Sequence, residues 1–398
     1  MSSLPCAIAG LPDGPASHAH GYPSFRIERE PMKKLRRRKE KVNGLSVGLD
    51  LHKRFIQVSI LDHRGDEILA ERFRADQAVL SEQVDRWLAL KGADKGLAVA
   101  LEASGCFVWA YDLLKAKLGK QAVSVAAPSK VKVIAEAGEK TDASDAWWLA
   151  YLLQERRLPE AFVAEGNLRE LRIASRELRS VVDERSDLMR RMRSHLAQLG
   201  VSFAKSDWAS VPGRQRITTL VDQAEASEGL RGQAIARLWQ RIQALDEEVK
   251  HWNQQVQSLS KKFDQVALLD EQLPGVGPVI AAIVWSELGD PDRYRSAKAY
   301  AKATGLSPGY RESGGRRSKG RITREGSAHV RWALTRAVLS CMRCTKGPGV
   351  AVKAWVQRQA RRKPRKAAMV AAARKLAEGI WRLMKLGEAF DLRRTFPT

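Results

Sequence analysis

The chain has 398 residues, and 44% of them are hydrophobic, so it is long enough for two or three domains, and global disorder is not expected. Lysine and arginine number 69 against 45 acidic residues, and the net charge of +24 favours a polyanionic partner, most simply nucleic acid. The longest apolar run, Val279–Trp285, is far shorter than the about 20 residues of a membrane span, and no signal peptide is visible.

The positive charge is concentrated near the C-terminus. Residues 293–398 hold 27 basic and 5 acidic residues, a net charge of +22. Residues 1–41 have a net charge of +5, and the 251 residues between these two segments have a net charge of −3. Contacts with a polyanion are therefore expected mainly in the last quarter of the chain. The 251 residues before it are expected to have a role other than general binding of a polyanion.

The first 44 residues are interpreted as a disordered basic arm. Residues 1–31 are rich in Pro, Gly, Ser and His without periodicity, and Met32–Lys41 is strongly basic. Met32 is an alternative start of translation. The four cysteines are too few for a disulfide scaffold and suit a reducing cytoplasm, with association with the bacterial nucleoid expected during any reaction on DNA.

Residues 45–160 alternate between strand and helix patterns and predict an α/β layer fold. Three strands in a meander come first, then a helix over 76–91, a fourth strand, a helix, and a fifth strand. The strands are expected at 46–51, 55–61, 67–74, 97–102 and 122–126, and the second helix at 109–118. Residues 130–137 and 143–153 complete the set.

Residues 161–265 contain two long helices with apolar residues at coiled-coil spacing. The first seam runs from Leu171 to Leu199 and is interrupted at Ser175 and Arg185. The second runs without a break from Leu238 to Phe263. Two interpretations remain open: a helical hairpin that packs on itself, or a seam between subunits.

Four carboxylates are the candidate catalytic group. Asp50 and Glu102 end the first and fourth strands, and Asp142 and Asp145 share one face at the start of a helix. Four carboxylates brought together repel one another unless a cation neutralises them, and oxygen ligands select Mg²⁺ or Mn²⁺. The alternative for each residue is structural; Asp142, for example, suits a helix cap.

A helical, basic domain is expected over 266–345, followed by a basic helical tail over 346–398. The segment Leu273–Ala282 is typical of a helix-hairpin-helix, in which Gly275 and Gly277 let the backbone approach a phosphate, although any tight helix connection favours the same residues. Cys341 and Cys344 form a single CxxC pair. A structural zinc site needs four ligands, so two small thiols on one helix face are the better interpretation.

Residues 305–326 form a glycine-rich basic segment that contains Ser313. Two glycines follow this serine, and five cations come next: Arg316, Arg317, Lys319, Arg321 and Arg324. A hydroxyl among cations can attack a phosphate if a base or a metal takes its proton. The alternative, which composition alone favours, is a flexible basic loop that contacts the DNA backbone.

The segments Val47–Lys53 (VGLDLHK), Ala100–Ser104 (ALEAS) and Lys140–Ala146 (KTDASDA) together resemble the DEDD transposases of the insertion-sequence-110 family. The resemblance covers about residues 45–345, including the C-terminal block. It implies an RNase H-like domain similar to the RuvC resolvase, with Asp50, Glu102, Asp142 and Asp145 as the metal-binding tetrad. It also implies a serine nucleophile, best matched by Ser313, with Ser307 as the alternative.

The resemblance further implies a recombinase that cuts and rejoins donor and target DNA, a structured guide RNA encoded by the element, and a homo-oligomer, a dimer or a tetramer. Two alternatives are a hydrolytic nuclease or junction resolvase, in which water attacks the phosphate, and a non-catalytic nucleic-acid-binding protein. Nothing in composition or spacing indicates an RNA.

Overall fold

The computed structural model describes residues 42–128, 130–131, 141–204, 207–313 and 316–397, and the side chains of 310–319 are not included in the description. The expectations for the N-terminal arm and for most of 130–137 therefore lie outside the described residues. The chain divides into two compact units, one of residues 41–190 with 240–398, and one that contains residues 191–239. No helix in the described ranges is both long enough and apolar enough to cross a membrane.

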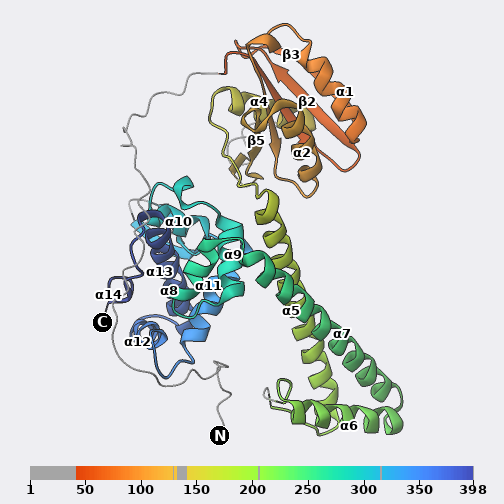
Figure 1. The fold of residues 1–398 in the computed structure, drawn as a ribbon, viewed down its shortest axis with the longest axis vertical. Helices are drawn as coiled ribbons and strands as arrows, with labels where there is room; N and C mark the ends of the chain where they lie inside the picture. The colour runs from red at the N-terminus through yellow and green to blue at the C-terminus, as the bar shows by residue number, and fades with distance from the viewer. Residues whose placement is uncertain (1–41, 129, 132–140, 205–206, 314–315, 398) are drawn as a thin grey trace. The chain divides into compact units, whose positions relative to one another are not determined.

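A five-stranded mixed sheet forms the N-terminal part of the larger unit (Figure 1). The strands, all predicted to within one residue, lie in the order β3-β2-β1-β4-β5. Their bounds are β1 Leu45–Leu51, β2 Phe55–Leu61, β3 Glu67–Arg74, β4 Leu97–Glu102 and β5 Val123–Ala126. The first three strands form the predicted antiparallel meander, and β4 and β5 add in parallel beside β1. A mixed α/β layer of this kind fits an RNase H-like domain.

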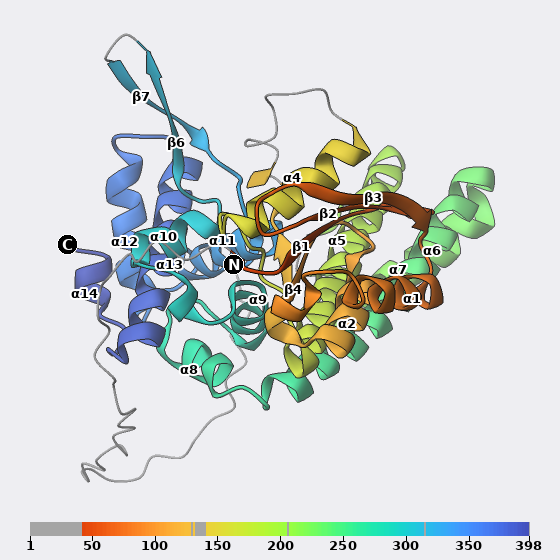
Figure 2. The same cartoon turned by 90° about the horizontal axis from the view of Figure 1, so that it is seen from above.

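Helices cover both faces of this sheet (Figure 2). Helices α1 (Gln77–Leu88) and α2 (Phe107–Leu118) lie on one face, and α4 (Asp142–Gln154) lies on the other. Successive strand residues point to opposite faces. Val47 and Leu49 of β1 accordingly share a buried cluster with α1 and α2, and the even-numbered positions of β1 face α4. Short 3₁₀ turns, Ala93–Lys95 and Lys120–Ala122, precede β4 and β5.

Helices α5 (Gly166–Gln198) and α7 (Gly229–Ser260) are the two predicted long helices. Within the larger unit, seam positions of both helices are buried in one cluster, among them Leu171, Leu178 and Val256. The predicted break at Arg185 has a physical reason, because its guanidinium pairs at 2.7 Å with Asp246 of α7. These seam positions are thus buried within a single chain, as the hairpin alternative predicts.

Residues 191–239 form the second unit, which includes a helix that the sequence patterns did not predict, α6 (Val211–Ser227). Its core is aromatic. The buried Trp208 packs edge-on against Phe203 and Trp239, with ring centroids 6.4 and 6.2 Å away. Asp207 pairs with Arg216 at 2.5 Å.

The C-terminal part of the larger unit is mainly helical and has one continuous core. Its helices are α8 Asp264–Gln272, α9 Pro278–Leu288, α10 Ala297–Ala303, α11 Ala328–Cys341, α12 Gly349–Ala360, α13 Arg365–Leu386 and α14 Leu392–Thr395, with a 3₁₀ turn at Pro291–Arg293. The basic tail is folded onto this core, because Ala372, Leu376 and Ile380 of α13 are fully buried. Pro364 separates α12 from α13.

One element departs from the expected helical domain. Residues Pro308–Ser313 and Arg316–Ile322 form two antiparallel strands, β6 and β7, rather than an irregular loop. The hairpin extends beyond the helices of this part of the chain (Figure 2). The expectation of a flexible loop around Ser313 is therefore wrong for the backbone of the two strands.

Candidate functional site

Polar residues form a row across the sheet on the face that α4 covers. Asp50 pairs in register with Gln57 of β2, and Gln57 pairs with Arg72 of β3. Leu49 pairs with Leu101 in the parallel β1–β4 ladder, so Glu102 lies beside Asp50 one residue further along. Directly opposed residues point to the same face of a sheet. The two strand-end carboxylates therefore share one edge and one face, as predicted.

A glycine lets α4 approach this row closely. A Cβ atom at Gly48 would lie 1.9 Å from the carbonyl oxygen of Ala146 and 2.6 Å from the amide nitrogen of Ala150. Only a residue without a side chain fits such a contact. The close packing brings the first turn of α4, which carries Asp142 and Asp145, over the end of β1.

The N-terminus of α4 is fixed by a capping box. The Thr141 hydroxyl accepts a hydrogen bond from the Ser144 amide, and the Ser144 hydroxyl accepts one from the Thr141 amide. The N-cap residue is thus Thr141, and Asp142 is the first helical residue. The alternative interpretation, in which Asp142 is the helix cap, is therefore wrong.

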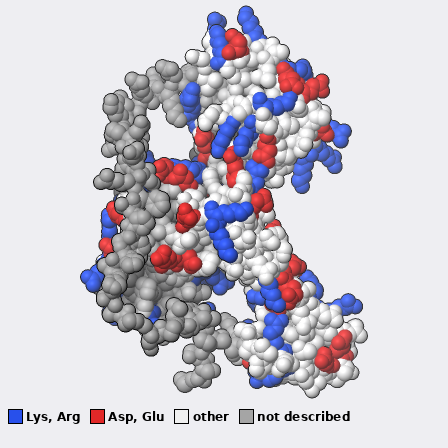
Figure 3. Space-filling model, in the orientation of Figure 1, with Lys and Arg blue, Asp and Glu red and all other residues white. Residues whose placement is uncertain are grey.

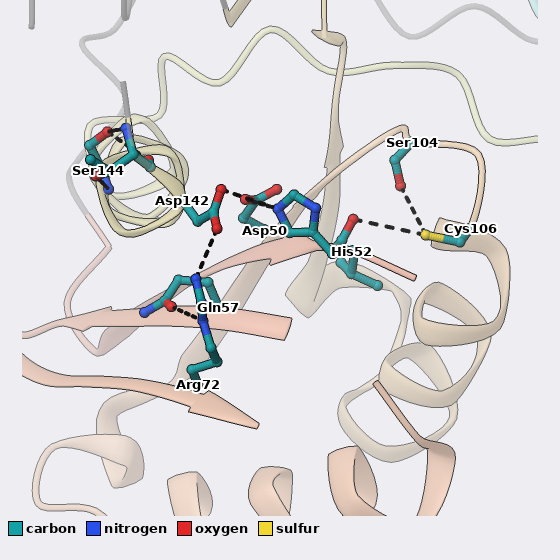
Figure 4. A network of polar contacts seen from close by, with 10 residues as sticks. Asp50, His52, Gln57, Arg72, Ser104, Cys106, Asp142 and Ser144 are labelled. Atoms are coloured by element: carbon teal, nitrogen blue, oxygen red, sulfur yellow. Dashed lines mark hydrogen bonds and ion pairs between the residues drawn. The ribbon is translucent and has the colours of Figure 1, made fainter. Parts of the chain in front are cut away.

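Two of the predicted carboxylates meet at a histidine (Figure 4). His52 Nε2 lies 2.9 Å from Asp50 Oδ2 and 3.4 Å from Asp142 Oδ1. Arg72 donates to Asp142 Oδ2 at 2.8 Å and, through Nε, to Gln57 Oε1 at 3.1 Å. The Phe55 ring packs against both side chains, stacked on His52 at 4.5 Å and lying 4.1 Å from the Arg72 guanidinium carbon.

The environment of Asp50 disfavours its negative charge. Its side chain is 12% exposed, against 38% for Asp142. Burial raises the pKa of Asp50, the adjacent His52 opposes this rise, and the charges of Asp145 and Asp142 add to it. Asp145 lies in the same first turn of α4 as Asp142. An added cation would relieve this repulsion.

This arrangement can hold a metal ion. One ligand atom each from Asp50, His52 and Asp142 lies within 4.8 Å of the others. The carboxylates come from a strand end and a helix start, so they are held on rigid elements. The oxygen-rich set suits a hard divalent cation. Glu102 lies on the same edge by register.

Three residues of this site were missed by the sequence analysis: His52, Arg72 and Gln57. His52 had a usable signal, because the Asp-x-His spacing at a strand end carries both side chains to the same region. Arg72 and Gln57 had no such sequence signal, because their position beside Asp50 and Asp142 depends on the register of three strands.

The predicted helix-hairpin-helix segment joins α8 to α9. Gly275 has φ of +72°, and a Cβ there would lie 2.3 Å from the Ala337 carbonyl and 2.6 Å from Cys341 Sγ. Gly275 is therefore required by backbone conformation and by packing on α11. Gly277 is different: it precedes α9 in an extended conformation, and a Cβ would meet nothing within 4 Å.

The same packing explains the CxxC pair. Cys341 is fully buried beside Gly275, and burial raises the pKa of its thiol to about 12, so it stays protonated. Cys344 lies against Gly349, where a Cβ atom would come within 2.7 Å of the sulfur. Cys341 is the last residue of α11 and Cys344 lies three residues beyond it, so the expectation that both thiols share one helix face is wrong for Cys344.

The β6–β7 hairpin carries both candidate serines. Ser313 ends β6 and pairs with Arg316, the first residue of β7, and Gly314 and Gly315 lie outside the described residues. Ser307 lies at the root, where its carbonyl accepts a hydrogen bond from the Thr323 amide at 2.9 Å. Arg331 of α11 braces this root by donating to the carbonyls of Arg324 at 3.1 Å and Gly326 at 2.7 Å.

The predicted cations follow the second strand of this hairpin. Arg316, Arg317, Lys319 and Arg321 all belong to β7. Arg321 and Arg324 are exposed. By contrast, the face in Figure 3 shows Lys and Arg of the sheet domain and the long helices mixed with Asp and Glu. The hairpin segment, residues 308–322, is thus basic, and Glu312 is its single acidic residue in the sequence.

Two family models match the chain. One, described as a transposase and named for the DEDD transposases of IS110, matches residues 47–201, which include the sheet with Asp50, Glu102, Asp142 and Asp145. The other, described as the transposase IS116/IS110/IS902 family, matches residues 268–351, which include the helix-hairpin-helix segment and the β6–β7 hairpin.

Curated proteins of the same kind are similar over most of the chain. A putative transposase of Sinorhizobium fredii, y4pF/y4sB, is 27% identical over 79% of this chain and 80% of its own length. The transposase for insertion sequence element IS1111A of Coxiella burnetii is 22% identical over 96% of this chain and 98% of its own. The transposase for element IS1328 of Yersinia enterocolitica is 24% identical over 53% of this chain and 62% of its own.

Proposed function

Because the chain belongs to the IS116/IS110/IS902 family of transposases, we propose that it moves an insertion sequence by cutting DNA strands with a serine nucleophile and rejoining them with the help of a divalent metal. The observation that carries this proposal is the meeting of Asp50 and Asp142, 92 residues apart, at the end of β1. Both carboxylates lie within 3.4 Å of one imidazole nitrogen, His52 Nε2.

Asp50, Glu102, Asp142 and Asp145 are proposed to hold Mg²⁺ or Mn²⁺. The donor chemistry fits, because these are hard oxygen ligands on one face, and the raised pKa of Asp50 reflects burial and uncompensated negative charge. A bound divalent ion would stabilise charge on the phosphate and on the attacking and leaving oxygens.

His52 and Arg72 are proposed to tune this site. The imidazole lies between Asp50 and Asp142, so it either contributes a nitrogen ligand or moves aside when an ion binds. Arg72 holds Asp142 at 2.8 Å while Gln57 holds Arg72, and this chain fixes the carboxylate orientation.

Ser313 is proposed as the nucleophile. In the transesterification step, Ser313 Oγ loses its proton and bonds to phosphorus, while the bond from phosphorus to one deoxyribose oxygen breaks and that oxygen takes up a proton. A second transfer to a DNA hydroxyl reverses these changes. One phosphodiester linkage exchanges for another, so no ATP is required. The exposed Arg321 and Arg324 support phosphate binding beside the hairpin.

Donor and target DNA are the proposed substrates, and the basic segment 293–398 is the proposed contact surface, with Gly275 and Gly277 shaping a phosphate site before α9. A structured guide RNA and a homo-oligomer, a dimer or a tetramer, remain proposals that follow from the family alone. Ser307 remains the alternative nucleophile.

A denaturing gel of protein incubated with its element DNA and Mg²⁺ tests the proposal. A covalent protein–DNA adduct that Ser313→Ala abolishes supports the serine mechanism, and Ser307→Ala serves as the matched control from the hairpin root. DNA binding should persist in Ser313→Ala, because one hydroxyl contributes little to an affinity based on many cations.

Other results of the same gel would support one of the alternative functions or the alternative nucleophile. Free nicked product without an adduct would indicate a hydrolytic resolvase in which water attacks. Binding without any cut would indicate a non-catalytic nucleic-acid-binding protein. An adduct lost in Ser307→Ala but kept in Ser313→Ala would exchange the roles of the two serines.

A further inference from the structure

Helix α4 carries an aromatic cluster on the face that turns away from the sheet. Trp147 and Tyr151 are four residues apart, so they lie on one side of the helix. Their rings are stacked, with centroids 5.1 Å apart and planes 7° from parallel. Trp148 meets both rings edge-on, at 5.2 and 5.7 Å. All three side chains are partly exposed.

The fold of the sheet domain does not need this cluster. The sheet-facing side of α4 is already complete, with Ala146, Leu149 and Ala150 buried against the strands. Trp148 packs partly on the cluster around Leu149, but Trp147 and Tyr151 are in neither buried core of the sheet domain. Partly exposed aromatic rings can stack against a further ring.

The position of the pair indicates which ligand. Trp147 follows Asp145 by two residues and Tyr151 by six, so the two rings lie roughly 3 and 9 Å further along the helix axis. One DNA strand advances roughly 3.4 Å per stacked nucleotide. At about 100° per residue, both rings also lie on the side of α4 away from Asp145, so a strand with a phosphate at the carboxylate site has to pass around the helix and reaches the rings only after several nucleotides.

The charges at the far end of the cluster also suit a nucleic acid. Arg156 and Arg157 follow α4 directly and are exposed, and neither forms an ion pair with an acidic side chain among the described residues. Aromatic rings flanked by free cations are the usual combination for single-stranded nucleic acids, where bases stack and phosphates pair with arginine. An apolar protein partner would leave these guanidinium groups without counterions.

We propose that Trp147 and Tyr151 form a stacking platform for one or two unpaired bases of the DNA strand that enters the carboxylate site, with Arg156 and Arg157 contacting its phosphates. This inference rests on the proposed function, because it takes the carboxylates as the place where the DNA phosphate binds. It adds a contact to bases, which neither the carboxylates nor the hairpin cations supply.

Binding of a fluorescent single-stranded DNA of mixed sequence, in the full chain with Mg²⁺, tests the platform. Trp147→Leu keeps an apolar side chain but removes the aromatic ring, and Trp147→Phe restores a ring. Trp109→Leu is the matched control, because Trp109 is also partly exposed but lies on α2 at the opposite face of the sheet.

The expected result is a loss of affinity of about 5- to 150-fold for single-stranded DNA in Trp147→Leu, since one stacked base contributes about 1–3 kcal/mol. Trp147→Phe should recover most of this loss. Trp109→Leu should bind like the wild type, and the affinity of Trp147→Leu for a blunt duplex should stay within about twofold, because its bases are paired and stacked.

Three results would overturn the platform. They are unchanged single-strand affinity in Trp147→Leu, equal losses for single strand and duplex, and a changed oligomeric state in sedimentation, which would assign the rings to a protein interface. A loss confined to an RNA of the same sequence would also refute a DNA platform. Adduct formation by the wild type is measured separately. An adduct together with unchanged binding in Trp147→Leu would refute the platform and leave the proposed function standing, whereas a loss of binding without any adduct would refute the proposed function.

Discussion

Replacing Gly48 by alanine should damage the fold and the carboxylate site together. The added methyl group would lie 1.9 Å from the Ala146 carbonyl oxygen, whereas carbon and oxygen normally approach to about 3.3–3.6 Å. Helix α4 would have to move outward by roughly 1.5 Å to relieve the contact. Overpacking of this kind costs about 1–3 kcal/mol, which corresponds to roughly 2–12 °C in the unfolding temperature of a domain of 150–250 residues.

The same movement should separate Asp142 from Asp50, because Asp142 begins the helix that the methyl group displaces. Thermal unfolding with and without Mg²⁺ measures both effects. We expect a lower unfolding temperature in Gly48→Ala and a smaller stabilisation by Mg²⁺. Gly105→Ala is the control, because a Cβ at Gly105 meets nothing within 4 Å and its φ is not in the left-handed region. Wild-type stability with undiminished stabilisation by Mg²⁺ in Gly48→Ala would refute the close-packing argument.

Four further substitutions are informative. Burial raises the pKa of Asp50, and the nearby carboxylates add to the rise. Ionised Asp50 therefore destabilises the metal-free fold as pH rises through that pKa. Asp50→Asn should raise the metal-free unfolding temperature at pH 7 and abolish stabilisation by Mg²⁺. Burial opposes ionisation of Glu165, but hydrogen bonds from Tyr111, Lys120 and Lys115 prevail and lower its pKa to about 2. Glu165→Gln should therefore cost about 1.5–3 kcal/mol in denaturant unfolding at pH 7, and this difference should shrink as pH falls toward 2. Gly275→Ala should destabilise the helical core, whereas Gly277→Ala should fold normally and, if the phosphate site is real, weaken DNA binding in a filter assay.

The sheet could be predicted from the sequence because its strands carry strong local signals. Apolar residues alternate along β1, where Ser46, Gly48 and Asp50 separate four apolar residues, and largely along β2, so each strand is recognisable alone. Strand ends then locate Asp50 and Glu102 without any tertiary information. The start of α4 is marked by Thr141 and Ser144, whose side chains cap it.

The rest of the site depends on register, which no single strand encodes. Arg72 reaches Asp142 across 70 residues only because β3 pairs with β2 at one particular offset. The close approach of α4 depends on Gly48, which in sequence is one small residue among many. Sequence therefore pointed to Asp50 and Asp142, which the structure brings together at His52, but not to the groups that contact them.

The β6–β7 hairpin was missed for a different reason. Its strands are built mostly from Arg, Ser, Gly and Glu, so no apolar face produces an alternating pattern. The usable signal was the pair Gly314-Gly315 between two segments of matching length, which is typical of a two-residue hairpin connection. Composition described this segment as a basic loop because composition does not register strand pairing.

The hairpin geometry bears on the choice between the two serines. Ser307 lies at a root fixed by the Thr323 amide and by Arg331, whereas Ser313 is six residues further along an extended strand, roughly 20 Å away at 3.3 Å per residue. In the proposed mechanism the nucleophile has to reach a phosphate held at the carboxylates, and a residue at the end of a projecting strand has a reach that Ser307 lacks. Arg331 holds the backbone just after β7 through the carbonyls of Arg324 and Gly326, so its hydrogen bonds fix the chain next to Ser307 and leave Ser313 at the far end of β6.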